Sequence, residues 1–325
     1  MPSPRYSKND VKEPWQSSPI NVRLPKKLIR DIDGFAKEYE LNRSEVIRQA
    51  LTFYLTMLKN IGSIIRPTVF KLVPSQVTLM KRGDVTLMKL PTGLILSLSY
   101  TSSGGIGPKP MDKIKVDGFT LGRFMTRVAL MDTISINSWP KLMVATLSVE
   151  MNPTGIEILR GMRSEAKKVG MDPDQSISMN TEENISTDQT GLGVTAVGLV
   201  HEDELRMGRT QPNDALVLIG EPKVGDEVIQ AEKEGKIADL HDLVRLTQLD
   251  FIHDLIPVDT QGIAYEARMI AHMVGRQVEF YNNLKIDLEK PAGPATAVLT
   301  TMDEAQIEKL TWITRKPITI VGRVL

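Results

Sequence analysis

The stretch INVRLPKKLIRDID runs from Ile20 to Asp33, and NRSEVIRQALTFYL follows from Asn42 to Leu55. Between Ile20 and Leu24 apolar and polar residues alternate strictly, a pattern typical of a half-buried β-strand. Pro25 then stops a strand ladder and suits the first turn of a helix. The sequence therefore predicts a short strand at residues 20–24 with a helix directly behind it.

Two small amphipathic helices are expected after this strand. The first has an apolar stripe at helical spacing, formed by Leu28, Ile32, Phe35 and Tyr39. Asn42 or Ser44 can cap the second helix. Its apolar stripe consists of Ile47, Ala50, Leu51, Tyr54, Leu55 and Leu58. So short a segment cannot bury a core of its own, and its single strand has an unpaired edge. Two copies that pair their strands would solve both problems, so we expect residues 20–60 to form a dimer.

This strand-helix-helix layout closely resembles the ribbon-helix-helix DNA-binding domain of Arc- and MetJ-type repressors. In that family the paired strands enter the major groove of double-stranded DNA, which implies base contacts for the outward side chains Asn21 and Arg23. Asparagine suits adenine and arginine suits guanine, through two hydrogen bonds each. The resemblance also implies a DNA phosphate at Asn42, Arg43 and Ser44, because the free N–H groups at a helix start favour an anion.

The charge of this segment distinguishes two hypotheses, a DNA-binding domain and a segment that only holds two chains together (a dimerisation clasp). The whole chain has a formal net charge of +0, so only a local basic patch can attract DNA. Such a patch is formed by Arg23, Lys26, Lys27, Arg30, Arg43 and Arg48. We therefore expect a double-stranded DNA operator as a partner and add Lys26 to its contacts. The alternative is a clasp whose outer strand face is only solvated.

The remaining composition narrows the class of protein. The 325 residues leave room for two or three domains, and 41% apolar with 25% charged residues is ordinary for a soluble globular protein. The sequence contains no run of 18 apolar residues, so no membrane-spanning helix is predicted. Residues 1–19 have neither a periodic pattern nor the apolar core of a signal peptide, and we expect them to form a disordered tail. Zero cysteines fit a cytoplasmic location with no membrane partner. The four histidines show no H-x-x-x-H spacing, which argues against a zinc site.

Beyond a connector at residues 61–80, strands and helices alternate to the end, which predicts a mixed α/β (α+β) fold. DVTLMKL and GLILSLS indicate a hairpin around residues 91–93, and KLMVATLSV, GVTAVGLV, DALVLIG and PITIVGRV indicate further strands. Three helices are expected among them, with the apolar stripes Leu121, Phe124, Met125, Val128 and Ala129; Leu159, Met162, Ala166 and Val169; and Ile263, Ala267, Ile270 and Val274.

Six motifs in this part resemble the aminoimidazole ribonucleotide synthetase superfamily, which also contains selenophosphate synthetase and thiamine-monophosphate kinase. They are RGDVTLMKL, SSGGIGPKPMD, SVEMNPTGIEILRGM, NTEENISTDQTGLGVTAVG, QPNDALVLIGEPKVGDEV and DTQGIAYEARMIA. The α-ribazole kinase subgroup is the most similar. The resemblance implies a two-part domain with halves at residues 81–210 and 211–325. It also implies dimerisation through the first half and a cleft for ATP and magnesium between subunits and half-domains.

The resemblance implies a ligand site at particular residues. Magnesium prefers several oxygen ligands and bridges phosphates. The matching carboxylates are Asp84 and Glu182 or Glu183, with Asp112, Asp117, Asp132 and Glu150 of lower rank. The expected ligand contacts are Gly104, Gly105, Gly107, Lys109, Asn180, Thr181, Glu182, Glu183, Asn184 and Gly262. Lys109 and Lys223 are the cations nearest to this site in the sequence.

Three departures from the family pattern indicate changed chemistry. Tyr100 and Thr101 stand where the family has a metal-binding aspartate, and neither replaces a carboxylate as a strong magnesium ligand. The later glycine-rich loop is reduced to DTQGI, and SMNTEEN lacks the glycine of the related GSTEEN. We therefore expect magnesium binding to be weak or absent, with Asp84 and Glu182 as the remaining metal candidates. We also expect a surviving pocket and lost catalysis.

These observations lead to one main hypothesis and two alternatives. The chain is a ligand-responsive transcriptional regulator, a homodimer or higher homo-oligomer, whose second domain senses ATP, a related nucleotide or a nucleoside as its small-molecule effector. The first alternative is an active ATP-dependent kinase of small molecules, similar to α-ribazole kinase, that carries an autoregulatory DNA-binding module. The second makes the later domain a dimerisation scaffold, which leaves the NTEENISTDQTG loop without a role.

Overall fold

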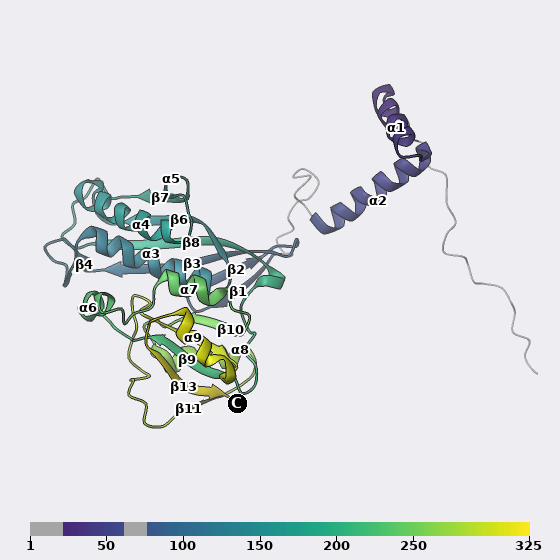
Figure 1. The fold of residues 1–325 in the computed structure, drawn as a ribbon. Coiled ribbons are helices and arrows are strands. Elements are labelled where there is room, and N and C mark those ends of the chain that lie inside the picture. Colours follow the sequence, from purple (N-terminus) through teal and green to yellow (C-terminus); the bar gives the residue numbers. More distant parts are fainter. Residues whose placement is uncertain (1–21, 62–76) are drawn as a thin grey trace, which may run out of the picture. The chain divides into compact units, whose positions relative to one another are not determined.

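The structure is a computed structural model that describes residues 22–61 and 77–325. The chain divides into two compact units, Met1–Phe70 and Lys71–Leu325 (Figure 1). The tail predicted at residues 1–19 and most of the connector predicted at 61–80 lie outside the described residues. Within the described ranges, no helix is long and apolar enough to cross a membrane.

The described part of the first unit contains two helices, α1 (Lys26–Glu38) and α2 (Arg43–Ile61), which confirms the predicted helix pair. The strand predicted at residues 20–24 lies partly outside the described residues, and residues 22–24 form no strand in the single chain. A strand requires a ladder, and the predicted ladder is with the same strand of a second copy. Pro25 has extended backbone angles, φ −60° and ψ 144°, and α1 begins directly after it.

A reciprocal pair of hydrogen bonds starts α2. The Asn42 side chain accepts a hydrogen bond from the Glu45 backbone N–H at 3.0 Å, and the Glu45 carboxylate accepts one from the Asn42 N–H at 2.9 Å. This arrangement satisfies two donors that a helix start otherwise leaves free. Arg43 also donates two hydrogen bonds of 2.7 Å to the Asp33 carboxylate on α1. Of the two predicted caps, the structure uses Asn42.

The apolar stripes of the first unit remain largely exposed in the single chain. None of the 13 residues of α1, all of which are described, is buried. Phe35 and Tyr39 stack with 6.1 Å between their ring centroids, yet they are 56% and 60% exposed. Leu51 on α2 is 54% exposed. Exposed apolar side chains are unfavourable in water, so these stripes indicate an interface with another apolar surface.

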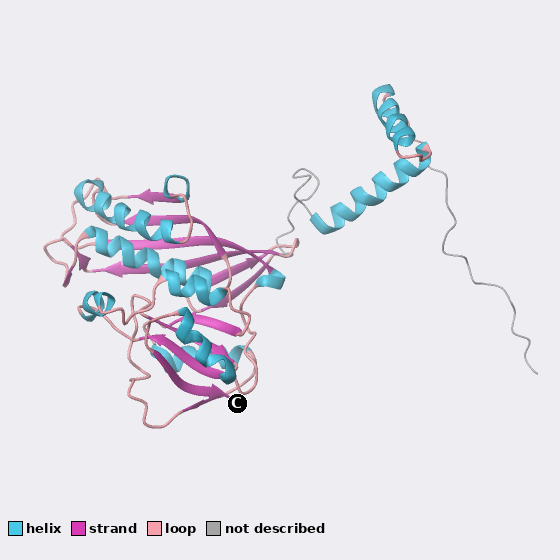
Figure 2. Cartoon of the chain, viewed as in Figure 1, coloured by secondary structure: helices cyan, strands magenta, loops and turns pink. Residues whose placement is uncertain are grey.

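The second unit begins with a six-stranded sheet in the order β1-β2-β3-β8-β6-β7 (Figure 2). Its strands are β1 (Thr78–Arg82), β2 (Val85–Lys89), β3 (Leu94–Gly104), β6 (Trp139–Leu147), β7 (Ile177–Asn180) and β8 (Gly191–His201). Neighbours pair antiparallel except β6 and β7, which are parallel. The pairing of β2 with β3 confirms the predicted hairpin. A short parallel pair follows β3, formed by β4 (Ile106–Gly107) and β5 (Ile114–Lys115).

Two long helices, α3 (Gly118–Ser135) and α4 (Ile156–Lys168), lie over one face of this sheet (Figure 1). They approach each other closely, since a Cβ added at Gly122 would lie 2.1 Å from the Ile158 carbonyl oxygen. The stripe predicted on α4 needs one correction. Ile158 is fully buried and Leu159 only half-buried, because the contact with α3 places Ile158 at the centre of the interface.

The opposite face of the six-stranded sheet carries apolar side chains that the described residues cover only in part. Tyr100 on β3 is 42% exposed, and Trp139 and Leu142 on β6 are 54% and 37% exposed. They alternate along their strands with fully buried residues such as Ser99 and Met143. An apolar face of this kind indicates a surface that another molecule covers.

The second sheet has five antiparallel strands in the order β10-β12-β9-β13-β11. They are β9 (Ala215–Gly220), β10 (Ile252–Pro257), β11 (Val278–Phe280), β12 (Ala297–Met302) and β13 (Ile318–Val324). The helices of this half are α6 (Glu227–Lys233), α7 (Leu240–Thr247), α8 (Gly262–Met273) and α9 (Ile307–Ile313). A short helix, α5 (Pro173–Ser176), precedes β7 in the first half.

One continuous core joins the two halves of the second unit. Val217 and Ile219 of β9 belong to the same buried cluster as Met125 of α3. On the other face of β9, Leu218 packs in a cluster with Ile270 of α8. The central strand is therefore buried on both sides, and the halves fold against each other. The predicted division at residues 210 and 211 falls between β8 and β9, where the chain passes from one sheet to the next.

Candidate functional site

A cavity of about 400 Å³ lies between the two halves of the second unit. Its walls come from the end of β3, β4, β5 and α3 in the first half, and from residues 224–225, 228–229, 259–260 and 293–294 in the second. A volume of this size accommodates a small organic molecule. Most of the lining is apolar: Ile106, Ile114, Val116, Leu121, Phe124, Met125, Val128, Val224, Val228, Ile229 and Pro294.

The polar residues that line this cavity are few. Thr101, Ser102 and Ser103 line it from the end of β3, and Thr120 lines it from α3. The Ser103 hydroxyl is buried without a hydrogen-bond partner. Asp259 also lines the cavity, and no lysine, arginine or histidine in the described part of the chain does so. The cavity therefore suits a largely apolar ligand with a few hydrogen-bonding groups.

A smaller hollow of about 110 Å³ adjoins the cavity, because Asp259 and Thr260 line both. Its other carboxyl groups come from distant parts of the sequence. Asp84 lies in the β1–β2 turn, Asp132 on α3 and Glu266 on α8. We call this site the carboxyl hollow.

The carboxyl hollow holds more acidic groups than its one guanidinium can balance. Burial raises the pKa of Glu266 to about 8, and the charge of Asp259 adds to this effect. Burial and Asp259 likewise raise the pKa of Asp132 well above its usual value, and burial with Asp84 raises the pKa of Asp259. Arg82 is 4% exposed, and its Nη1 has no hydrogen-bond partner. Burial and neighbouring carboxyl groups thus favour the protonated form of these three residues, and a cation brought close favours their ionised form.

The structure does not assemble the predicted magnesium site within one chain. Asp84 lies in the carboxyl hollow, whereas Glu182 follows β7 at the opposite edge of the six-stranded sheet. Four strand spacings separate β2 from β7, roughly 19 Å. Among residues 22–61 and 77–325, no group of three or more histidine, aspartate or glutamate side chains is disposed to hold a metal ion. Within one chain, Asp84 and Glu182 therefore do not lie close enough to hold one magnesium ion together.

The predicted loop at residues 180–184 lies at a third hollow, of about 220 Å³, at the ends of β6 and β7. Asn180, Thr181 and Glu182 line it. Glu182 accepts a hydrogen bond from the Asn184 backbone N–H at 2.7 Å, and Glu183 accepts one from the Thr181 hydroxyl at 3.0 Å. The two carboxylates thus brace the loop itself, away from the residues that line the 400 Å³ cavity.

The predicted glycine cluster divides between the cavity and a structural turn. Gly104 lines the cavity. Gly105 has a φ of 70° and Gly107 a φ of 148°, and a Cβ at Gly107 would lie 2.5 Å from a Thr190 oxygen. Lys109 forms an ion pair of 2.5 Å with Glu150. Burial alone would raise the pKa of that glutamate, but the bonds from Lys109 and a threonine lower it to about 2. Lys109 therefore neutralises a neighbour and does not line the cavity.

Three more candidate residues have structural partners. Asp112 accepts hydrogen bonds from the Thr190 backbone N–H at 2.8 Å and from its hydroxyl at 2.7 Å. Asp117 is the N-cap of α3 and accepts a backbone N–H at 2.6 Å. Gly262 has a φ of 78°, and a Cβ there would lie 2.8 Å from the Glu289 backbone. A glycine is thus required where α8 begins against residues 288–289.

Tyr100 and Thr101, which stand in place of the family's aspartate, lie on opposite faces of β3. Thr101 lines the cavity, whereas Tyr100 belongs to the exposed apolar face of the sheet. Successive residues of a strand point to opposite faces, which accounts for the difference. Only Thr101 can therefore contact a ligand in the cavity.

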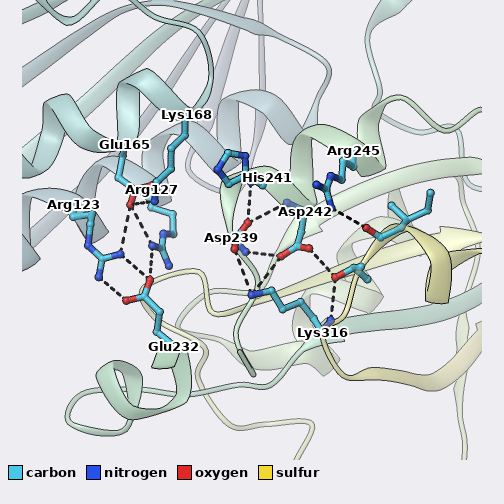
Figure 3. A network of polar contacts seen from close by, with 12 residues as sticks. Arg123, Arg127, Glu165, Lys168, Glu232, Asp239, His241, Asp242, Arg245 and Lys316 are labelled. Carbon is cyan, nitrogen blue, oxygen red and sulfur yellow. Dashed lines mark hydrogen bonds and ion pairs between the residues drawn. The ribbon is translucent and has the colours of Figure 1, made fainter. Parts of the chain in front are cut away.

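Helix α6 forms one wall of the cavity and is fixed by ion pairs. Val228 lines the cavity, and Glu232, one turn further on, accepts hydrogen bonds from Arg123 at 2.8 Å and Arg127 at 2.6 Å (Figure 3). Arg127 is 1% exposed and also pairs with the fully buried Glu165 of α4 at 3.2 Å. Burial opposes the charge of Glu232, but the Arg123 bond and the Arg127 charge lower its pKa to about 2. This network holds α6 against α3 and α4.

Three residues of the carboxyl hollow are not among the site residues that the sequence predicts: Asp259, Glu266 and Arg82. One signal was available, because Asp259 opens the DTQGI motif directly after a buried strand, and Glu266 follows seven residues later on a helix. Residues seven apart lie on one face of a helix, but Asp259 precedes α8, so only the fold shows that the two carboxyl groups meet.

All residues predicted to contact DNA belong to the first unit, and all except Asn21 are among the described residues. Arg23, Lys26 and Ser44 are exposed. Asn42 and Arg43 are also exposed, but Asn42 caps its own helix and Arg43 is hydrogen-bonded to Asp33 on α1. The Arg43 hydrogen bonds lower the pKa of Asp33.

Comparison with known proteins assigns a fold to each unit. Residues 18–57 match the model of the family described as ribbon-helix-helix protein, copG family. No curated protein sequence matches the chain. Among solved structures, a chain of the HypE-HypF complex has a TM-score of 0.53 at 18% identity, covering 73% of this chain and 86% of that chain.

Two thiamine-monophosphate kinases have the same fold. The protein from Stenotrophomonas maltophilia K279a has a TM-score of 0.51 at 15% identity, covering 78% of this chain and 90% of its own. The protein from Aquifex aeolicus has a TM-score of 0.51 at 14% identity, covering 70% and 84%. The chain thus joins a small helical module to a two-sheet domain. The first is a ribbon-helix-helix domain, and the second has the fold of the aminoimidazole ribonucleotide synthetase superfamily, as its motifs predicted.

Proposed function

We propose that the chain is a DNA-binding transcriptional regulator whose second unit binds a small organic effector. One observation carries the DNA-binding part: residues 18–57 match a ribbon-helix-helix family, and the described residues among them form a helix pair whose apolar side chains are uncovered in the single chain. A second copy would cover those side chains and pair the strands, and the exposed Arg23 and Lys26 would then face DNA.

Two separate surfaces support a homodimer. One is the pair of apolar stripes on α1 and α2, which includes Phe35 and Leu51. The other is the exposed face of the six-stranded sheet, with Tyr100, Trp139 and Leu142. A dimer that uses both surfaces would couple the second unit to the DNA-binding strands. An effector that favours one spacing of the two strands by about 1–3 kcal/mol would change operator occupancy about 5- to 150-fold.

The experiment for this function begins by selecting, from random duplexes, the sequence that the full chain binds. Arg23→Ala should then weaken binding to that sequence by about 1–3 kcal/mol and relax the preference at one base position. Lys37→Ala is the matched control, because it removes a cation from the end of α1. The proposal fails if Arg23→Ala leaves both affinity and base preference unchanged.

A second candidate function is small-molecule phosphorylation with ATP. The observation that favours it is the carboxyl hollow, which places the predicted Asp84 beside Asp132, in a fold that thiamine-monophosphate kinases also have. ATP, magnesium and α-ribazole should be incubated with the chain and with Asp132→Asn. Magnesium-dependent ADP release that the substitution abolishes would make the chain a kinase, and its absence supports the regulator.

A further inference from the structure

We propose that the cavity binds an organic cation, a molecule with an apolar body and one positively charged nitrogen beside Asp259. This proposal gives a chemical class to the effector and rests on the proposed function for its regulatory meaning. The binding itself depends only on residues of the second unit.

The body of such a ligand is defined by the apolar walls. Aliphatic side chains from β4, β5, α3 and α6 surround a volume of about 400 Å³, enough for a bicyclic aromatic molecule. Phe124 supplies one aromatic wall, and the guanidinium carbons of Arg123 and Arg127 lie 4.7 and 4.6 Å from its ring centroid, which fixes the ring. Burial of an apolar body here removes it from water without the loss of a polar contact.

The charge of the ligand is defined by what surrounds the cavity. In the described residues its lining includes Asp259 but no basic side chain, and Asp259 also belongs to the carboxyl hollow with Asp84, Asp132 and Glu266. A cation at that end of the cavity would favour the ionised form of these carboxyl groups and pair with it. A positively charged nitrogen is therefore favoured there, and the phosphates of ATP, with about four negative charges, are not.

The lysines expected near the site do not reverse this balance. Lys109 pairs with Glu150 at 2.5 Å, and Lys223 pairs with Glu221 at 3.0 Å. Neither lysine lines the cavity. A triphosphate would have to break these ion pairs before it gained either lysine as a partner, which is an additional cost.

The polar end of the cavity is already organised for a ligand. The Asp259 carbonyl accepts hydrogen bonds from the Gly262 and Ala292 backbone N–H groups, both at 3.2 Å, so the residue is held in place. Ser103 lines the same cavity, and its hydroxyl is buried without a hydrogen-bond partner. A buried hydroxyl without a partner is unfavourable, and a ligand heteroatom would satisfy it. The two groups set the positions of a cationic nitrogen and a second polar atom.

The test uses calorimetry on the full-length chain at pH 7 with four probes. Tryptamine, tryptophol and indole-3-propionate have the same aromatic body and carry a positive, no and a negative charge, and ATP is the fourth. Tryptamine should bind about tenfold more tightly than tryptophol, because a charge-assisted hydrogen bond replaces a neutral one. Indole-3-propionate and ATP should bind more weakly than tryptophol. Equal binding of the three indoles, preference for ATP, or no binding at millimolar concentration would overturn the proposal.

Two variants locate the binding. Asp259→Asn should remove the tenfold preference for tryptamine and leave tryptophol binding unchanged. Val224→Trp should block binding of all the indoles, because Val224 lines the cavity and is 44% exposed. Ile156→Trp is the control, since Ile156 is 43% exposed and lines none of the three hollows. Tryptamine binding that survives both Asp259→Asn and Val224→Trp at full strength would place the site elsewhere and refute the proposal.

The same samples separate this proposal from the proposed function. If no indole binds while the chain still binds its selected DNA, the cavity proposal fails and the DNA-binding function stands. If tryptamine binds and Asp259→Asn removes its advantage, the ligand class is supported even where the chain binds no DNA. Magnesium chloride alone is a further arm, and saturable magnesium binding that excludes tryptamine would assign the carboxyl hollow to a metal and overturn the proposal.

Discussion

The two units of this chain place the same types of apolar residue in opposite positions. In the second unit, side chains from both halves close into one core, and Met125 and Val217 belong to one buried cluster. In the first unit, Phe35, Tyr39 and Leu51 are all more than half exposed. A segment whose apolar residues meet within one chain can fold alone, whereas one whose apolar residues face outward gains its stability by association. The stability of the first unit should therefore depend more strongly on protein concentration than that of the second.

The largest expected effect on DNA binding comes from placing a charge on the exposed stripe of the first unit. Phe35→Asp should reduce DNA binding about 100-fold, because a buried carboxylate at a dimer interface is strongly unfavourable. Thermal unfolding of the second unit should not change. Trp312→Asp is the control, since Trp312 on α9 is 88% exposed in the second unit. If Phe35→Asp bound DNA like the unmodified chain, the exposed stripe would not be an interface.

A second contrast concerns arginine–carboxylate pairs. Arg127 and Glu165 are 1% and 0% exposed in the second unit, whereas Arg43 and Asp33 in the first are 56% and 46% exposed. A buried charge that loses its partner is costly, while water replaces the partner of an exposed one. The same chemical pair should therefore matter for stability in one unit and little in the other.

Arg127→Met tests the buried pair. It leaves Glu165 with Lys168 at 2.8 Å and Arg123 at 3.7 Å, so it should destabilise the second unit by about 3 kcal/mol. Chemical denaturation followed by circular dichroism measures this change. Adding Glu165→Leu should restore part of the loss, because no buried charge then lacks its main partner. Additive losses in the double variant would show that the two residues do not act as a pair.

The sequence predicts the elements of this chain well and the assembly of its site poorly. Local periodicity is enough for the helix pair and the β2–β3 hairpin, since both depend on neighbouring residues. The carboxyl hollow depends on residues 84, 132, 259 and 266, which only the packing of two sheets brings together. Motif matching placed Gly104 at the cavity but selected Lys109, whose charge the structure pairs with Glu150. A sequence motif therefore locates a loop, but it does not show which of the charged side chains in that loop form ion pairs.

The ion pairs of α6 predict a loss of stability in acid. The folded-state pKa of Glu232 is about 2, below the ordinary value of 4.5, so the folded state binds this proton less readily than the unfolded state. The contribution to stability is full above pH 4.5 and is lost as the pH falls from 4.5 to 2. We expect a loss of about 2 kcal/mol, reduced from the full shift because the side chain is 26% exposed.

Denaturation measured at several pH values between 2 and 6 checks this expectation. Glu150 has a similarly lowered pKa of about 2 and adds a loss in the same window. Glu232→Gln should therefore reduce the loss of unfolding free energy at acid pH only in part, and the Glu232→Gln/Glu150→Gln double variant should reduce it further. If the loss at acid pH is the same with and without Glu232→Gln, the ion pairs in Figure 3 do not contribute to the pH dependence of stability.

The smallest expected effect belongs to Arg43, where two roles compete. The structure bonds its guanidinium to Asp33, and the ribbon-helix-helix resemblance places it at a DNA phosphate. An exposed pair contributes little to stability, so Arg43→Met should leave the melting curve of the chain unchanged. If Arg43 turns from Asp33 to a phosphate on binding, affinity should fall by a similar small factor for every DNA sequence, and the salt slope should decrease by about 1. Asp33→Asn is the sharper partner variant, because it frees Arg43 for DNA and should strengthen binding slightly. An altered base preference in Arg43→Met would contradict the phosphate role, since phosphate contacts carry no sequence information.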